Sequence, residues 1–169
     1  MNLDISTLAT HYFHLAGFKH DRSVPVASSV PFDHPAHDLL ARFGGLHIGV
    51  GEDNEMLGGV RNDVAFEPTG RYGEIDQWER LLKTRLVGVA GTHHRHGLLY
   101  VSDDERFFNL SGMHDAMGFA GRGVRNAIDN LLFDESKPMI RPEQTSVAWY
   151  GIDYFHGDPA LYDYTKSNS

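Results

Sequence analysis

The sequence predicts one domain in which helices pack on a sheet, and two stretches carry most of that prediction. In LLARFGGLHIGVG (39–51) an amphipathic helix, a double-glycine stop and an apolar strand follow one another without a gap. From residue 86 onward the apolar period changes from helical to strand-like, in three short segments separated by polar turns. Links this short cannot make parallel crossovers, so these segments are predicted to form an antiparallel meander.

The first part of the chain contains three predicted amphipathic helices. Asp4 or Ser6 can cap the first, and Asp33 followed by Pro35 can start the second. The apolar face of the first helix comprises Ile5, Leu8, Ala9, Tyr12 and Ala16, before a stop at Gly17. The apolar face of the second helix comprises Ala36, Leu39, Leu40 and Phe43, and Gly44 and Gly45 follow it. The apolar face of the third helix comprises Ile75, Trp78, Leu81, Leu82 and Leu86.

Strands are predicted between and after these helices. Leu46, Ile48 and Val50 alternate as a half-buried strand does, and DVAFE (63–67) should return antiparallel beyond an acidic, glycine-rich loop. Pro68 and Gly70 should end that second strand. The meander strands are LVGVAG (86–91), GLLYV (97–101) and RFFNL (106–110).

In the segment after the meander, apolar residues recur at helical spacing from Ser111 onward. Ser111 could cap the helix that this spacing predicts. Glycines in GFAGRG (118–123) weaken a helix by up to ~1 kcal/mol each, so a break is expected there and a firm helix at 124–132. The glycines of GFAGRG are spaced as in phosphate-binding loops. The alternating β and α elements that surround a dinucleotide site are missing from the sequence. Close helix packing is the better interpretation of these glycines.

The last 36 residues, 134–169, differ in character from the rest. Pro138 and Pro142 lie in a polar linker, and SVAWYGIDYFHGDPALYDY then contains six aromatic side chains. So many rings should pack on the domain or on a partner. We therefore expect a main domain at 1–133 and an aromatic-rich C-terminal extension at 134–169.

Composition limits the possible functions. The 169 residues are 41% hydrophobic and 22% charged, and no apolar run approaches the roughly 20 residues that span a bilayer. No leader peptide is evident, so we expect a cytoplasmic protein that does not bind membranes. Cysteine is absent, which excludes disulfides and thiolate chemistry. The net charge of −8 argues against direct nucleic-acid binding and fits a basic partner, although it also serves solubility.

The densest group of possible metal ligands is His93, His94 and His96, in THHRHG. No HExxH or equivalent spacing accompanies them, so a polar hairpin turn with solvated imidazoles is the stronger interpretation. A Ser-His-Asp hydrolase stays open among eleven histidines, but the sequence has no GxSxG elbow. The carboxylates of Asp103, Asp104 and Glu105 lie at a predicted turn, which is too wet for general acid-base catalysis. Together with those of the acidic loop they could form an electrostatic contact with a basic surface.

The order of these segments resembles the SUKH superfamily of bacterial immunity proteins, and its third subfamily most. The first matching motif is AGFKHDR, in which Phe18 stands where tryptophan is common and Arg22 follows it. The second is LLARFGGLHI, followed by the acidic loop, the third helix, LVGVAG, GLLYVSDDERFFNL and a closing helix. The resemblance covers about Leu3 to Leu132 and leaves the aromatic C-terminal run outside.

This resemblance implies an α+β fold, a SUKH-like single domain whose antiparallel or mixed sheet packs against several helices. It implies an immunity protein that binds and neutralises a cognate toxin of a polymorphic or contact-dependent system, often a nuclease. It carries over no catalytic residue, metal or cofactor, and it leaves the oligomeric state open. The candidate contact residues are Glu52, Asp53, Glu55, Asp103, Asp104, Glu105, Trp149, Tyr150, Tyr154 and Phe155.

Two other classes of function compete with this hypothesis. A small histidine-dependent metalloprotein or hydrolase would use His93, His94 and His96 and would contain stoichiometric zinc. A regulatory or scaffolding module, a role that the SUKH fold also has, would bind a host protein with no toxin encoded nearby.

Overall fold

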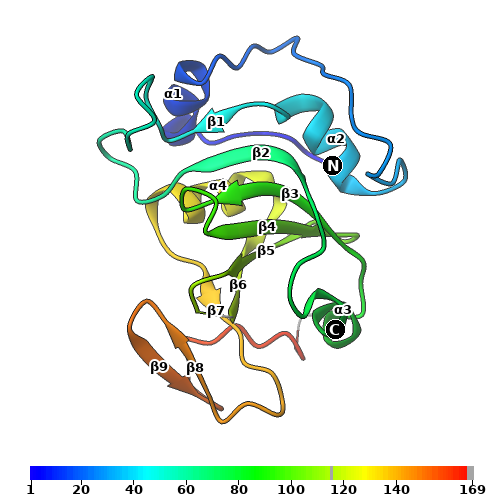
Figure 1. Cartoon of the computed structure of the whole chain (residues 1–169), viewed down its shortest axis with the longest axis vertical. Helices are drawn as coiled ribbons and strands as arrows, with labels where there is room; N and C mark the ends of the chain where they lie inside the picture. The colour runs from blue at the N-terminus through cyan, green and yellow to red at the C-terminus, as the bar shows by residue number, and fades with distance from the viewer. Residues whose placement is uncertain (115, 167–169) are drawn as a thin grey trace.

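In a computed structural model of the chain, residues 1–114 and 116–166 are described, and within them a seven-stranded antiparallel sheet runs in the order β1-β2-β3-β4-β5-β6-β7 (Figure 1). The helices are α1 (Thr7–Leu15), α2 (Pro35–Phe43), α3 (Ile75–Leu82) and α4 (Gly123–Phe133). The strands of the sheet are β1 (His47–Ile48), β2 (Val64–Thr69), β3 (Leu86–Thr92), β4 (Gly97–Ser102), β5 (Arg106–Ser111), β6 (Ala116–Arg122) and β7 (Lys137–Pro138). A separate hairpin pairs β8 (Ser146–Trp149) with β9 (Ile152–Phe155). The predicted α+β class and the antiparallel meander β3-β4-β5 are confirmed.

Both faces of the sheet are buried, each by a different layer. Along β4, Leu99 and Val101 join the core that α1, α2 and α4 complete. Tyr100, between them, joins a second core with α3 and with aromatic residues near the C-terminus. Alternate side chains of a strand point to opposite faces, so these two cores lie on opposite sides of the sheet. Figure 1 shows α1 and α2 at one end of the long axis and the β8–β9 hairpin at the other.

Helix α2 forms where it is predicted, and all four residues of its apolar face are buried. Its predicted cap was wrong. His34 takes that position, and its Nδ1 accepts a hydrogen bond from the backbone N–H of Ala36 at 3.1 Å. The carboxylate of Asp33 instead contacts the guanidinium of Arg85, 3.1 Å away. An imidazole can replace the usual capping carboxylate only while Nδ1 is unprotonated.

Helix α1 is shorter than its prediction, and four of the five predicted face residues, Ile5, Ala9, Tyr12 and Ala16, pack on the core. Ser6 caps the helix, as one of the two predicted caps, and accepts a hydrogen bond from Ala9 N at 3.0 Å. Its buried residues are Ala9 and Phe13, whereas Leu8 is 62% exposed. The large ring of Phe13 belongs to an aromatic cluster in the core, and this contact sets which face turns inward.

The predicted helical segment from Ser111 to the glycines was wrong: Ser111 ends β5, and residues 116–122 form β6. Because β6 is buried on both faces, apolar residues occur at nearly every position and imitate helical spacing. The glycines of β6 allow neighbouring segments to pack closely against its backbone. A Cβ at Gly118 would lie 2.8 Å from the Trp149 ring, and one at Gly121 would lie 2.9 Å from the backbone N of Ala127 in α4.

The C-terminal residues continue the fold in the region 137–166. Lys137 and Pro138, predicted as linker, pair with β6 as the seventh strand. Further on, the ring of Tyr162 stacks on that of Phe119 at 3.9 Å, and Tyr164 meets Trp78 of α3 edge-on. The division of the chain at residue 133 stays a prediction.

Strand β2 also departs from its prediction at its end. It runs through Pro68 to Thr69, with an irregular register between Phe66 and Thr69 that accommodates the proline. Among the helices of residues 1–114 and 116–166, none combines the length and apolar character that a bilayer crossing requires.

Candidate functional site

The sheet has two ends of contrasting chemistry. Val64 pairs with Thr92, Thr92 with Gly97, and Gly97 with Ser111, so the loop 49–63, the turn 93–96 and residues 112–114 leave the sheet at one end. The turn 150–151 joins them, since the ring of Tyr150 lies 5.9 Å from that of His93 and 5.5 Å from that of His114. We call this the histidine end. The turn 103–105 lies at the opposite end, which we call the arginine end after Arg85, Arg106 and Arg122.

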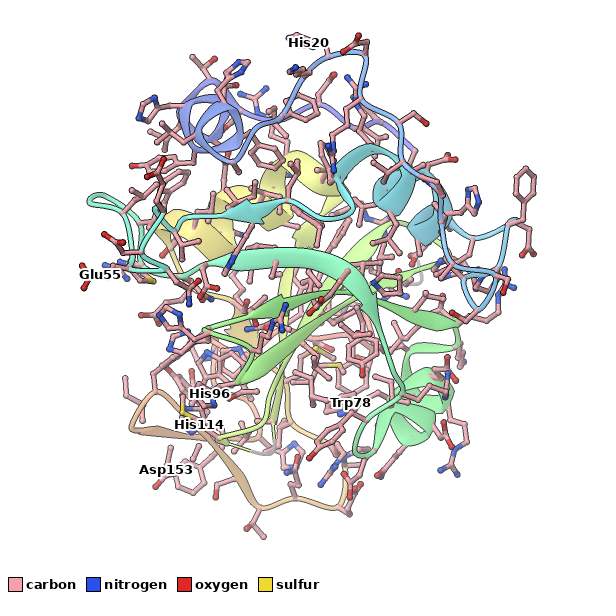
Figure 2. The ribbon with its side chains drawn as sticks, turned by 45° about the horizontal axis from the view of Figure 1, so that its top comes forward. His20, Glu55, Trp78, His96, His114 and Asp153 are labelled. Carbon is pink, nitrogen blue, oxygen red and sulfur yellow. The ribbon has the colours of Figure 1, made fainter. Side chains whose placement is uncertain are left out.

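Figure 2 shows Glu55, His96, His114 and Asp153 along one side of the molecule, with Trp78 on the other side. The labelled residues come from the loop 49–63, the β3–β4 turn, the β5–β6 connection and strand β9. Four segments that are far apart in the sequence therefore lie along the same side of the molecule in this view.

Two buried polar residues hold the histidine turn in place. Asn62 Oδ1 accepts hydrogen bonds from the backbone N–H groups of Asp63 and His93, at 2.8 and 2.7 Å. The fully buried carboxylate of Asp63 accepts one from the backbone N–H of His94 at 2.7 Å. This support is needed because His93, His94 and Arg95 all have positive φ. The sequence reading assigned Asn62 to a surface loop and Asp63 to a strand start, and it missed this clamp.

The turn THHRH is a hairpin turn as predicted, with His94 and His96 exposed and His93 half-buried. Burial lowers the pKa of His93 below its ordinary value. Within the described part of the chain, no three histidine, aspartate or glutamate side chains are placed to share a metal ion. The geometry therefore gives the metalloprotein hypothesis no ligand set.

Asp63 also forms an ion pair with His47 of β1, with Oδ2 and Nε2 2.6 Å apart. An Asp-His pair is two-thirds of a hydrolytic triad. Among residues 1–114 and 116–166, however, no serine or threonine hydroxyl makes a hydrogen bond to His47. The pair joins β1 to the start of β2, and in the described part of the chain it lacks the hydroxyl partner that a triad requires.

Glu52, Asp53 and Glu55 lie in the loop 49–63 and are exposed. None of the three forms an ion pair with another described residue, whereas most carboxylates on the remaining surface do. These three charges are therefore available to a partner without loss of an internal contact.

The carboxylates of the arginine end are already engaged within the protein. Asp103 accepts hydrogen bonds from the backbone and side chain of Arg85, at 3.0 and 2.7 Å. Asp104 binds the guanidinium of the 2% exposed Arg106 and that of Arg122. Burial acts to raise the pKa of Asp103 and of Asp104, but hydrogen bonds outweigh it and leave both below the usual range: those from Arg85 at Asp103, and those from the Ser102 hydroxyl and Arg106 at Asp104. Glu105 faces the N-terminal amino group at 3.7 Å.

The predicted aromatic contacts divide into buried and exposed residues. Trp149 is 1% exposed and packs in a small core with Val147 and Ile140, so a partner cannot reach it in this structure. Tyr154 is half-buried against the same core. Tyr150 and Phe155 are 40% and 59% exposed and remain accessible. Tyr150 belongs to the histidine end, while Phe155 lies on the opposite face of the hairpin from Trp149.

The two motifs that carried the family resemblance contact each other. The ring of Phe18 packs 5.5 Å from that of Phe43, and a guanidinium nitrogen of Arg22 donates a hydrogen bond to the carbonyl of Gly44. Gly45 has φ +82°, which glycine adopts at little cost. These contacts join the segment after α1 to the end of α2, so the two motifs have a structural role.

The family model described as SUKH-3 immunity protein matches residues 18–134, well over half of the chain. The chain belongs to the SUKH-3 immunity protein family. The match begins at Phe18 and ends one residue beyond α4, so the predicted resemblance to the third SUKH subfamily is confirmed. No curated protein and no solved structure matches the chain significantly. Membership of an immunity-protein family implies that the protein binds a cognate toxin and acts by binding and not by catalysis.

Proposed function

We propose that this SUKH-3 protein neutralises a basic, nuclease-type toxin of a polymorphic or contact-dependent system, in the cytoplasm, by binding directly over its active or substrate-binding surface. The family match carries this proposal. The net charge of −8 supports a basic partner, because complementary charge speeds association and selects the partner.

We assign the contact surface to the histidine end. Glu52, Asp53 and Glu55 can meet basic groups of the toxin without breaking an internal ion pair. Tyr150, at the same end, supplies a partly exposed aromatic ring of the kind that dominates the energy of protein interfaces. Asp103, Asp104 and Glu105 are a weaker choice, because a toxin would compete with partners that they already have.

The decisive experiment co-expresses the toxin encoded beside this chain with and without it in the native host. We expect survival only when both proteins are present, and a stoichiometric complex by calorimetry and size-exclusion chromatography. Toxin activity that is unchanged in the presence of excess purified protein, together with no measurable binding, would contradict the proposal.

A further inference from the structure

A polar pocket of about 90 Å³ opens at the histidine end. Its lining comes from segments that are distant in the sequence: Asn62 before β2, His93 in the β3–β4 turn, Asn130 in α4, and Asp134, Glu135 and Ser136 after α4. The partly exposed ring of Tyr150 also lines the pocket, as do Arg61, Asn109 and Leu131. None of these residues except Tyr150 was a candidate contact from the sequence.

Two side chains that line the pocket have polar atoms without a partner. Ser136 is 6% exposed, and its Oγ makes no hydrogen bond to any described residue. Nδ1 of His93 is likewise buried and without a hydrogen-bond partner in the described part of the chain. A buried polar group that lacks a hydrogen-bond partner costs stability. A polar guest that pairs with these two atoms would remove that cost.

The unpaired groups can act as acceptors. Asn130 donates from its Nδ2 to the carbonyl of Ala120 at 2.7 Å, and its Oδ1 accepts no hydrogen bond from residues 1–114 or 116–166. Burial lowers the pKa of His93, which favours the neutral imidazole, and in the tautomer protonated at Nε2 its Nδ1 accepts a hydrogen bond. The Ser136 hydroxyl accepts as readily as it donates.

The charges around the pocket favour a cation. Asp134 and Glu135 contribute two carboxylates against the single guanidinium of Arg61, which lies 3.4 Å from Glu135. Asp134 forms no ion pair within residues 1–114 and 116–166. An anion would meet this negative charge, and the whole protein is also acidic.

We propose that this pocket receives the guanidinium group of an arginine side chain of the toxin. Asp134 pairs with its charge, Asn130 Oδ1 and Ser136 Oγ accept its hydrogen bonds, and the Tyr150 ring covers its face. A guanidinium suits these separated acceptors better than an ammonium group, because it presents five donors in a planar fork. The inference rests on the proposed function for the source of the arginine, but the pocket itself can be tested without a toxin.

The first test is a titration of the ¹⁵N-labelled free protein with ethylguanidinium, followed by NMR. We expect saturable shifts of the Asn62, Asn130 and Ser136 signals at roughly millimolar concentrations, as for a probe of so few non-hydrogen atoms. Asp134→Asn should abolish these shifts, and Asp21→Asn, which removes the same charge from an exposed site beside His20, should leave them unchanged (Figure 2). Equal shifts with ethylammonium, shifts with acetate instead, or no shifts would overturn the proposal.

The second test measures the Kd of the toxin complex. Asp134→Asn and Ser136→Ala should each raise Kd about tenfold or more, with Asp21→Asn as control, since hydrogen bonds to charged groups contribute most to recognition. If the toxin is neutralised but neither variant changes Kd, the pocket inference fails and the proposed function stands. If ethylguanidinium binds while no toxin does, the proposed function fails and the guanidinium site stands.

Discussion

The arginine end and the histidine end of the sheet each present three carboxylates in a connecting segment, yet the two sets differ in their partners. Asp103, Asp104 and Glu105 contact three guanidinium groups, those of Arg85, Arg106 and Arg122, and the N-terminal amino group. Glu52, Asp53 and Glu55 form no ion pair among the described residues. The comparison teaches that acidic residues with equal formal charge can differ in availability: those of the arginine end are engaged within the fold, and those of the histidine end, where we propose recognition, are not.

The largest expected effect is a loss of stability when Arg106, the buried residue of the ion pairs at the arginine end, is replaced. Arg106→Met removes the guanidinium that contacts Asp104 at 2.8 Å and the carbonyl of Leu82 at 3.3 Å. Because Asp104 is 40% exposed, the expected loss is that of hydrogen bonds to a charged group, about 1.5–3 kcal/mol in the free energy of unfolding, which urea denaturation measures. The matched control is Arg95→Met at the histidine end, where the arginine is 66% exposed and the change should stay within about 0.5 kcal/mol. Equal stabilities of the two variants would remove the contrast between the ends.

Several parts of this picture could be predicted from the sequence, because they depend on local pattern. The apolar stripe of α2, with all four members buried, and the short polar turns of the meander specify their structures directly. The position of the acidic loop after the first strand could also be predicted, because its composition is rich in glycine and acidic residues. What local pattern could not reveal was which carboxylates are paired, because Asp104 meets Arg122 only after β5 and β6 have folded together.

The largest error, a helix predicted where β6 lies, has a physical cause, which is burial of that strand on both faces. Strand β6 is apolar at almost every position because helices cover one face and the C-terminal residues cover the other, and its period of two is lost. The glycines at 118 and 121 were the available signal, since they are unfavourable in a helix but allow close approach here. The polar pocket lay beyond sequence reasoning because its lining residues are joined only by the tertiary fold.

The next effect concerns recognition. Glu52→Gln with Glu55→Gln removes two unpaired charges from the histidine end and should lower the association rate constant with the toxin about tenfold at low salt. The loss should shrink at high ionic strength, where exposed charges are screened. Stopped-flow kinetics measure the association rate constant and its dependence on ionic strength. Asp21→Asn with Asp38→Asn, two exposed sites away from this end, changes the net charge equally and should lower the rate far less. An equal loss in both double variants would mean that only net charge matters.

A smaller effect should appear when the engaged carboxylates are neutralised. Asp103→Asn weakens the contacts to Arg85 and should lower the free energy of unfolding by about 1 kcal/mol, because this pair is partly exposed. The same variant should leave the affinity for the toxin unchanged. Thermal unfolding and calorimetry provide the two measurements. A loss of affinity without a loss of stability would move the contact surface to the arginine end.

The smallest effect is a pH dependence that originates at the arginine end. His34 is 2% exposed, and its burial lowers its pKa below the ordinary value of 6.5, although Asp103 at 3.6 Å acts in the opposite direction. The unfolded chain therefore binds a proton at a higher pH than the folded one. The free energy of unfolding should fall as the pH decreases from about 6.5, by no more than about 1.4 kcal/mol per pH unit for one proton. Paired carboxylates contribute to the pH dependence only near and below pH 4, because their pKa values are lowered as well.

His34→Asn keeps an acceptor at the cap of α2 and removes the titrating ring. Urea unfolding between pH 7.5 and 5 should show a flatter dependence for this variant than for the wild type. Replacing the exposed His20 by asparagine should leave the slope as it is. Parallel curves for wild type and His34→Asn would mean that the imidazole at the cap protonates without loss of the fold, and the charge network of Asp33, Arg85 and Asp103 would then have to accommodate a fourth ionised group.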